Sequence, residues 1–311
     1  MYTENRAKDV ALFAKAVLSN QLARFAPAAY MRLTRQTGRG EAPQSPAQVA
    51  DYFFRCFHDY GRALDLGKQE FAAFLKNKAV LEYGPGDILG VALLMYAHGA
   101  SKVHCFDRFP LHQASQHNLQ AYERLLASLD GRERERAARA FNEPGKPASG
   151  FDPSAIGYFV SKDGLCGASH EYDLVVSRAV LEHVGNLPGT VRDVARALKP
   201  DGVSVHEVDL RSHGLDRYRS FDFLTWPEPL YRLMFSKKGF PNRWRANTYR
   251  ALIEGSGLRI RKFQPTARLA CEEVALIEPH VPAALRGASH EELSWMGFWM
   301  VIEPAESAHL A

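Results

Sequence analysis

The sequence predicts an α/β protein built on a Rossmann-like, doubly wound sheet whose strands are mostly parallel. Apolar strands alternate with helical stretches from residue 79 onward, which is the rhythm of a parallel sheet covered by helices. A glycine turn, "GPG", follows the first strand and precedes a helical stretch, as in nucleotide-binding folds of this class. Three further strands and a terminal apolar segment extend the pattern to the end of the chain.

The chain divides into three predicted segments. Residues 1–76 form an N-terminal helical cap, with a break over 37–45 and a second helix over 47–66. Residues 77–210 form the Rossmann-like core, with strands predicted at 79–83, 102–107, 155–161, 172–177 and 202–210. Residues 211–311 hold a lid or insertion, a helix over 246–257, and two final strands at 258–264 and 293–303 that complete the same sheet.

The composition indicates an ordinary globular chain. Of 311 residues, 46% are hydrophobic and 24% are charged, and the net charge of +4 is spread along the chain instead of gathered in one stripe. We therefore expect no nucleic-acid partner. The four cysteines form no C-x-x-C pair, which argues against a zinc module or a disulfide framework and suits a reducing, cytoplasmic setting.

The N-terminal helix is amphipathic and basic. Lys8, Asp9 and Lys15 interrupt its apolar residues, so the apolar run of a signal peptide is missing. No segment approaches the roughly 18 apolar residues that a transmembrane helix needs. Two interpretations stay open: the helix docks on its own domain, or it lies on a membrane surface.

The glycine turn carries acids that decide which cofactor it suits. Glu82 ends the first strand, Gly84 and Gly86 form the turn, and Asp87 is predicted to cap a helix that stops at Gly99. The dinucleotide pattern G-x-G-x-x-G is imperfect, because its third glycine is replaced by Leu89 and Gly90 comes one residue late.

A pyrophosphate requires the positive end of a helix, and acids at the turn would repel it. S-adenosylmethionine carries a sulfonium and an ammonium group and no phosphate, so it suits these acids better than NAD. Asp107, 21 residues past Gly86 at the end of the second strand, is placed to bind both ribose hydroxyls.

Two stretches carry a family resemblance that covers about residues 78–210. "VLEYGPGDILG" resembles motif I of the class I S-adenosylmethionine-dependent methyltransferases of the type 11 kind, and "YDLVVSRAVLEHV" with "LKPDG" resembles their fourth-strand motif and the turn into the fifth strand. Ile88 departs from the family, in which many members have a third glycine. The resemblance also implies that the closing strand belongs to a C-terminal antiparallel hairpin.

The resemblance implies a set of cofactor-binding residues. Glu82, Tyr83, Gly84 and Gly86 would line the methionine half, Asp107 with Arg108 the ribose, and Asp163 the adenine. Ser177 and Arg178, followed by Glu182 and His183, would lie beside the methyl donor.

Residues after the fourth and fifth strands are candidates for catalysis. An oxygen or nitrogen acceptor can require a general base, and His183, Asp209 and His213 lie where open sheets bind ligands. Strand alternation places His206 on the face opposite Glu207, and Asp209 on the same face as Glu207. Each histidine also has a purely structural interpretation. No helix-spaced ligand pair is present, so no metal site is predicted.

The stretch "FPNRWRANTYR" is dense in planar donors. Arg243, Trp244 and Arg245 are predicted to bind an anionic or carbohydrate acceptor by charge and stacking, or alternatively to cap the next helix and face solvent. The aromatic segment 220–235 is interpreted as a lid over the acceptor or as core.

The predicted function is methyl transfer from S-adenosylmethionine to an oxygen or nitrogen atom of a small molecule or saccharide. Two alternatives remain: an NAD(P)-dependent oxidoreductase, and a non-catalytic partner protein that keeps a methyltransferase-like fold.

Overall fold

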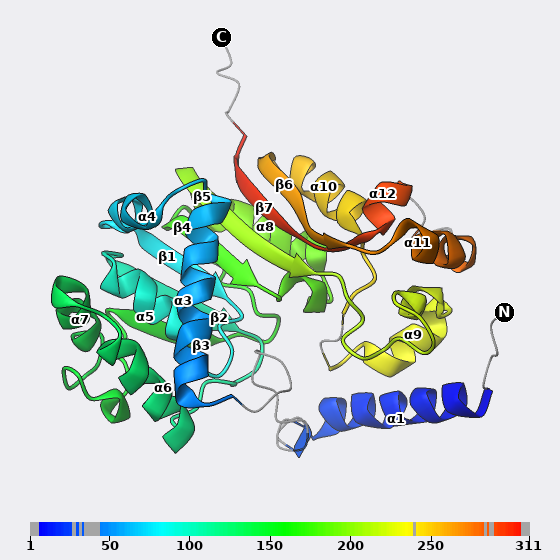
Figure 1. Ribbon diagram of the computed structural model, residues 1–311, viewed down its shortest axis with the longest axis horizontal. Helices are drawn as coiled ribbons and strands as arrows, with labels where there is room; N and C mark the ends of the chain where they lie inside the picture. Colours follow the sequence, from blue (N-terminus) through cyan, green and yellow to red (C-terminus); the bar gives the residue numbers. More distant parts are fainter. Residues whose placement is uncertain are drawn as a thin grey trace, which may run out of the picture.

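The computed structural model describes residues 6–26, 29–30, 33, 44–238, 241–282, 285 and 289–305. Within these residues a seven-stranded sheet forms the centre of the molecule, in the spatial order β3-β2-β1-β4-β5-β7-β6 (Figure 1). The strands are β1 (Ala79–Tyr83), β2 (Lys102–Asp107), β3 (Ile156–Val160), β4 (Tyr172–Arg178), β5 (Leu198–Asp209), β6 (Leu258–Arg268) and β7 (Trp295–Pro304).

The sheet is parallel apart from its C-terminal strand. β1 pairs in parallel with β2 and β4, β2 with β3, and β4 with β5. β7 runs antiparallel to both of its neighbours, β5 and β6. These pairings confirm the predicted Rossmann-like sheet with a C-terminal antiparallel pair. Because β1 to β5 are parallel, their carboxyl ends meet at one edge, where folds of this type bind ligands.

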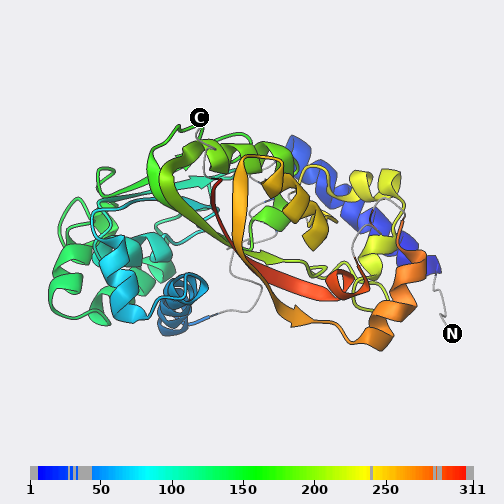
Figure 2. The ribbon, with the colours of Figure 1, turned by 90° about the horizontal axis from the view of Figure 1, so that it is seen from above.

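Helices cover both faces of the sheet (Figure 2). One face carries α3 (Pro46–Ala63), α4 (Lys68–Leu75), α5 (Gly90–Ala97), α6 (Gln116–Ala127) and α7 (Gly131–Ala138), and the other carries α8 (Leu187–Ala197) and α10 (Ala246–Glu254). The first face has a core in which Phe57 and Leu94 belong with Val176. The second has its own core, around Leu81 and Tyr249. Successive strand residues therefore face different helix layers.

A third apolar cluster joins the N-terminal helix to residues between 215 and 293. α1 (Arg6–Phe25) packs beside α9 (Glu228–Phe235), as Figure 1 shows. Asn20 fastens the pair, because its Nδ2 donates to the Leu233 carbonyl at 2.8 Å and its Oδ1 accepts from the Lys237 N–H at 2.8 Å. α1 thus docks on its own chain, while its outer face leaves Leu18 exposed.

The remaining elements are short, and they connect the larger ones. They are η1 (Pro147–Ser149), η2 (Leu181–His183), η3 (Asp222–Thr225), α11 (Cys271–Ile277), η4 (Glu278–His280) and α12 (His290–Leu293). Among the described residues no helix is long and apolar enough to cross a membrane. The predicted break over 37–45 falls mostly outside the described residues.

The predicted cap of the helix after the glycine turn is wrong. α5 begins at Gly90, after Leu89, and Asp87 lies in the preceding turn, where the Asn118 side chain holds its backbone carbonyl at 3.2 Å and its carboxylate at 3.4 Å. Ile88 and Leu89 are fully buried, so the chain places both of them in the core before the helix starts. The Tyr122 hydroxyl then accepts the Leu89 N–H at 2.8 Å.

Candidate functional site

The glycine turn between β1 and α5 is shaped by close contacts. Gly84 and Gly86 have φ values of +63° and +80°, a region that favours glycine. A Cβ atom at Gly84 would lie 2.4 Å from Val180 Cγ2, which belongs to the loop after β4. Gly84 therefore lets that loop close over the turn, and a side chain at this position is excluded.

Gly90 has a role that the dinucleotide pattern does not describe. A Cβ atom there would lie 2.3 Å from the ring of Phe53 in α3. The glycine one residue late is thus needed for α3 to pack on the start of α5, because any side chain would displace Phe53.

Glu82 is buried at the end of β1 and faces α3. Cys105 Sγ donates to its Oε2 at 3.7 Å, and burial raises its pKa to about 8. Glu82 is therefore not the fixed negative charge that was predicted from the sequence. In the free protein it is instead mostly protonated at neutral pH, and a cation placed beside it would favour the ionised form.

A small cavity of about 20 Å³ lies between Glu82 and the glycine turn. Its lining comes from three parts of the chain: Glu82, Gly84, Pro85 and Val91 around the turn, Arg178 at the end of β4, and Tyr52, Phe53, Cys56 and Tyr60 from α3. The predicted residues Glu82, Gly84 and Arg178 are thus brought together. The α3 residues were not predicted to line this cavity, because no local sequence pattern in that helix indicates that it packs on a turn further along the chain.

Arg178 connects the elements that surround this cavity. Its Nε is 2.8 Å from Glu207 Oε2 on β5, and its Nη1 donates to Asp59 Oδ2 on α3 at 2.8 Å. The guanidinium also lies over the Trp299 ring, 5.5 Å from its centroid. Arg178 therefore holds α3 against the sheet at the edge where the cavity lies.

Asp107 ends β2 with half of its carboxylate in use. Oδ1 accepts the Phe109 N–H at 3.2 Å, whereas the buried Oδ2 receives no hydrogen bond of ordinary geometry from the described residues, although the backbone of Arg108 and Gly86 lies near the carboxylate. Burial raises the pKa of Asp107 to about 6. A buried acceptor of this kind is costly unless a ligand supplies a donor.

Arg108 and Asp163 lie on the two chain segments next to Asp107. The Ser161 N–H donates to the Asp107 carbonyl at 3.0 Å, which brings the turn containing Asp163 to the end of β2. Gly164 in that turn is close to Arg108, since a Cβ atom built on it would lie 3.5 Å from Arg108 Cβ. Asp163 itself is exposed.

Tyr83 and Ser177 point to the opposite face of the sheet, so only their backbone borders the turn. The Tyr83 hydroxyl donates to Asp193 Oδ2 on α8 at 2.5 Å. Ser177 Oγ lies 2.7 Å from His206 Nδ1, and Ser204 Oγ lies 2.5 Å from His206 Nε2. Burial lowers the pKa of His206 to about 3, which makes it a neutral, hydrogen-bonded histidine of the sheet.

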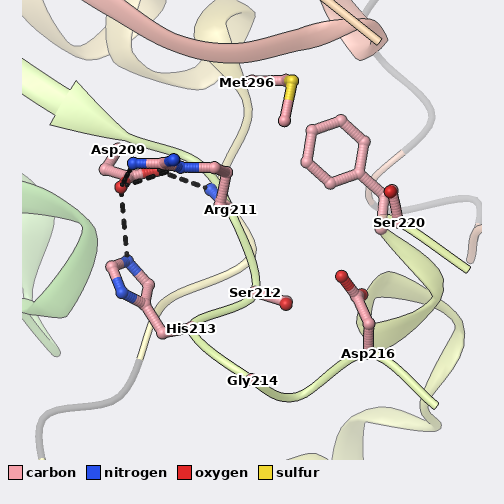
Figure 3. A pocket seen from close by; sticks show the side chains of 9 residues that line it. Asp209, Arg211, Ser212, His213, Gly214, Asp216, Ser220 and Met296 are labelled. Carbon is pink, nitrogen blue, oxygen red and sulfur yellow. Dashed lines mark hydrogen bonds and ion pairs between the residues drawn. The ribbon is translucent and has the colours of Figure 1, made fainter. Parts of the chain in front are cut away.

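A larger pocket of about 350 Å³ opens beyond β5 (Figure 3). It is lined by Asp209, Arg211, Ser212, His213, Gly214, Asp216, Ser220, Phe221 and Met296. Arg211 binds Asp209 with its Nη2 at 2.6 Å, and His213 Nε2 lies 3.9 Å from Asp209 Oδ2. Figure 3 shows Asp216 and Ser220 across the pocket from these residues.

Burial sets the charge states in this pocket. It lowers the pKa of His213, so the imidazole is neutral at neutral pH. Burial also raises the pKa of Asp209, but the hydrogen bonds from Arg211 outweigh it and hold the value below the usual range. His213 has a φ of +49°, an uncommon conformation outside glycine that turns its ring toward Asp209.

His183 lies beside this pocket on η2. Its ring centroid is 5.0 Å from that of His213, so the predicted His183, Asp209 and His213 are neighbours. Asn242 anchors η2, because its side-chain Nδ2 donates to the Leu181 carbonyl at 2.8 Å and its backbone N–H to the Glu182 carbonyl at 2.5 Å. Asn242 was not predicted, although it stands next to the singled-out arginines.

Arg243 and Arg245 are buried supports, and the described lining of the larger pocket includes neither. Arg243 binds the Leu224 and Trp226 carbonyls and the Glu228 carboxylate. Arg245 donates to the Trp295 carbonyl at 2.6 Å and lies 4.5 Å from the centroid of the Phe221 ring, which forms part of the pocket wall.

Trp244 is partly buried and packs against the core of the second sheet face. Of the three residues, Arg245 supports the pocket wall from behind, through the Phe221 ring.

Comparison with known proteins gives the family. A family model described as a methyltransferase domain matches residues 56–262, which is more than half of the chain. The chain belongs to the class I methyltransferase family. The match includes β1 to β5 and most of the residues that line the two cavities of this methyltransferase, whereas Tyr52 and Phe53 of the small cavity and Met296 of the larger pocket lie outside it.

Solved structures resemble the methyltransferase at low identity. A putative S-adenosylmethionine-dependent methyltransferase from Listeria monocytogenes is 15% identical, over 81% of this chain and 100% of that chain, with a TM-score of 0.42. One from Mesorhizobium loti is 18% identical, over 76% and 98% of the two chains, with a TM-score of 0.40. No curated protein matches the methyltransferase.

β5 links the two cavities of the methyltransferase. Glu207 binds Arg178, which lines the small cavity, and Asp209 lines the larger pocket two residues later. Residues two apart in a strand share a face and are about 7 Å apart. The small cavity and the larger pocket thus adjoin along one face, at the carboxyl edge of the sheet.

Proposed function

We propose that the protein transfers a methyl group from S-adenosylmethionine to an oxygen or nitrogen atom of a small molecule or saccharide. The observation that carries this proposal is the buried Oδ2 of Asp107, which lacks a hydrogen bond of ordinary geometry among the described residues. Asp107 is the last residue of β2, the position at which a Rossmann-like fold holds the ribose of a nucleoside. A ribose hydroxyl donating to Oδ2 would satisfy it.

The residues around the glycine turn fit the rest of this cofactor. Gly86, at a positive φ, allows a ligand to approach the backbone of the turn closely, and Glu82 offers a carboxylate that a cationic group would ionise. Arg178 borders the same cavity. Arg108 and the turn of Asp163 are proposed to flank the adenosine. Tyr83 and Ser177 would contribute through their backbone only.

The chemistry of methyl transfer explains why alignment is the main task of the chain. S-adenosylmethionine, when bound, supplies a methyl group on an activated sulfonium. The protein has to hold the acceptor atom in line with it and to exclude competing nucleophiles. The loop after β4, packed on Gly84 through Val180, lies between the two cavities and is suited to that positioning.

The larger pocket is proposed as the acceptor site. Its volume of about 350 Å³ lies within the range of small-molecule sites, about 300–1,000 Å³. The lining offers carboxylates and hydroxyls from Asp209, Asp216, Ser212 and Ser220, and its guanidinium, Arg211, is already bound to Asp209. This chemistry favours a hydroxyl-rich or amine acceptor over a phosphate.

Proton removal from the acceptor is assigned to the residues beside the pocket. His213 is neutral and close to Asp209, so it can accept a proton and be stabilised as a cation. His183 lies next to it and offers a second acceptor. The aromatic segment 220–235 contributes Ser220 and Phe221 to the pocket wall, while its other aromatic side chains are buried in the third apolar cluster, as the core interpretation predicts.

Turnover tests the proposal against a non-catalytic role. The protein is incubated with S-adenosylmethionine labelled in its methyl group and with a panel of sugars, phenols and amines, and labelled products are separated. We expect transfer to at least one hydroxyl or amine acceptor, and its loss in Asp107→Asn. Tight cofactor binding without transfer to any acceptor would instead favour the non-catalytic partner protein.

A further inference from the structure

Three potential metal ligands meet where the loops after β4 and β5 come together. Glu182 and His183 lie on η2, and His213 lies in the loop after β5. One donor atom of each lies within 4.8 Å of the donor atoms of the other two. Asp209 is next to the group, because its Oδ2 lies 3.9 Å from His213 Nε2 (Figure 3).

Glu182 is the unusual member of this group. Its side chain is fully buried, and neither carboxylate oxygen receives a hydrogen bond of ordinary geometry from the described residues. Burial raises the pKa of the Glu182 carboxyl group well above its usual range. The backbone of Glu182 and of Asp209 lies near this carboxyl group and favours its ionised form, but the effect of burial is larger. A buried carboxyl group in this state is costly unless a cation or donor satisfies it.

The donor set matches a divalent transition metal. Two imidazoles and one carboxylate, with open positions for other ligands, are typical of zinc and iron sites. With metal–ligand bonds of about 2.1 Å at tetrahedral angles, two donors on one ion are about 3.4 Å apart. The donor atoms therefore have to approach one another by up to about 1.4 Å, which requires rotation of the partly exposed side chains of His183 and His213.

We propose that Glu182, His183 and His213 bind one divalent transition-metal ion, with Asp209 as a further ligand or as the partner that orients His213. Asn242 supports the site by fixing the backbone of η2 from which two of the ligands project. The open positions of the ion face the larger pocket, since His213 and Asp209 line it.

The site has a consequence for the reaction, which rests on the proposed function. An ion there would hold a hydroxyl of the acceptor and lower its pKa, so that the hydroxyl loses its proton more readily. His183 and His213 would then act as ligands and would not be available as general bases. Metal binding itself depends on neither the cofactor nor the acceptor.

The first test measures metal binding in the absence of cofactor and acceptor. The full chain, without an affinity tag and in a Cys271→Ser background that removes an exposed thiol, is stripped with a chelator and titrated with zinc chloride by calorimetry. We expect one ion per chain. His213→Ala and Glu182→Gln should each weaken binding by at least about 100-fold, because losing even an outer-sphere partner costs 10–100-fold.

A matched control and a second metal make the result specific. His290 Nδ1 lies 3.0 Å from Glu278 Oε2, an exposed histidine–carboxylate pair, and His290→Ala should leave zinc binding unchanged. Manganese titrations should show the same ranking of variants. Should His213→Ala unfold, Glu182→Gln keeps the shape of the buried side chain and supplies the comparison.

The outcomes separate the metal site from the proposed function. Zinc binding that is equal in the parent, Glu182→Gln and His213→Ala, or absent from all three, overturns the site and leaves methyl transfer untouched. A parent that binds zinc through these residues but shows no methyl transfer supports the site and contradicts the proposed function.

Discussion

Phe109 and Asp107 share one hydrogen bond, which involves only one of the two carboxylate oxygens of Asp107. The Phe109 N–H donates to Asp107 Oδ1 at 3.2 Å, and the buried Oδ2 is left for a donor from outside the described chain. The turn after β2 thereby fixes the carboxylate in one orientation at the carboxyl edge of the sheet. This arrangement is suited to binding a diol such as a ribose.

Substitution of Asp107 should reduce cofactor affinity and leave the fold intact. Asp107→Asn replaces one carboxylate oxygen by a donor, and we expect the dissociation constant for S-adenosylmethionine to rise more than about tenfold, since a hydrogen bond to a charged group contributes about 1.5–3 kcal/mol. Calorimetry measures the change. Asp152→Asn is the control, because Asp152 is an exposed aspartate whose Oδ1 accepts the Ser154 N–H. This variant should bind S-adenosylmethionine as the parent does. Equal affinity in the folded Asp107→Asn protein would contradict the ribose assignment.

Glu82 should make cofactor binding depend on pH. Its pKa of about 8 in the free protein means that a cationic ligand must displace a proton below that pH. Affinity should therefore rise with pH, by at most about tenfold per unit, and level off near pH 8, where α-amino groups also lose their charge. Titrations from pH 6 to pH 8 check this, and Glu82→Gln should remove most of the slope.

The same residue should lower stability at alkaline pH. Because the folded pKa of Glu82, about 8, exceeds its ordinary value of 4.5, the folded state holds this proton more tightly than the unfolded state does. Its contribution is most favourable below pH 4.5 and is lost as the pH rises to 8. Denaturant unfolding of the parent and Glu82→Gln should show the variant gaining stability at pH 8 relative to pH 5. An equal difference at both pH values would argue against the raised pKa.

Gly84→Ala should destabilise the turn by about 1–3 kcal/mol, because alanine is strained at a positive φ and its Cβ would meet Val180. Val180→Ala removes both Cγ atoms and should recover part of the loss in the double variant. Denaturant unfolding of the two single variants and the double variant measures this coupling. Purely additive effects would mean that the two residues do not touch.

Tyr83→Phe should separate stability from cofactor binding. The hydroxyl bonds Asp193 on the face away from the glycine turn, so its loss should cost about 1–2 kcal/mol of unfolding free energy. The affinity for S-adenosylmethionine should change by less than about threefold, which is a smaller free-energy change than the loss of one hydrogen bond would cause. A large loss of affinity without loss of stability would show that the Tyr83 side chain does contact the cofactor.

Local patterns predicted the part of the fold in which we propose that the cofactor binds. β1, the glycine turn, β2 and Asp107 follow one another within about thirty residues, where strand and turn signals are strong. Strand alternation would also have separated Glu82 from Tyr83, whose side chains point to opposite faces, but the family resemblance grouped them.

Contacts between segments that are distant in the sequence could not be predicted from local patterns. Arg178 meets Asp59, 119 positions earlier, and Asn242 holds η2 some sixty positions before it. The role of Asp87 was predicted from a local capping rule that the tertiary contact with Asn118 overrides. Arg245 was assigned to the acceptor from its residue type, whereas burial against three backbone carbonyls decides its place.

Parallel calorimetric titrations with S-adenosylmethionine, S-adenosylhomocysteine, NAD and NADP test the central claim most directly, since they require no knowledge of the acceptor. We predict micromolar binding of the first two ligands, weakened in Asp107→Asn, and no binding of the nicotinamide cofactors. Binding of NAD or NADP, without binding of S-adenosylmethionine, would contradict the proposed methyl transfer and would favour the alternative of an NAD(P)-dependent oxidoreductase.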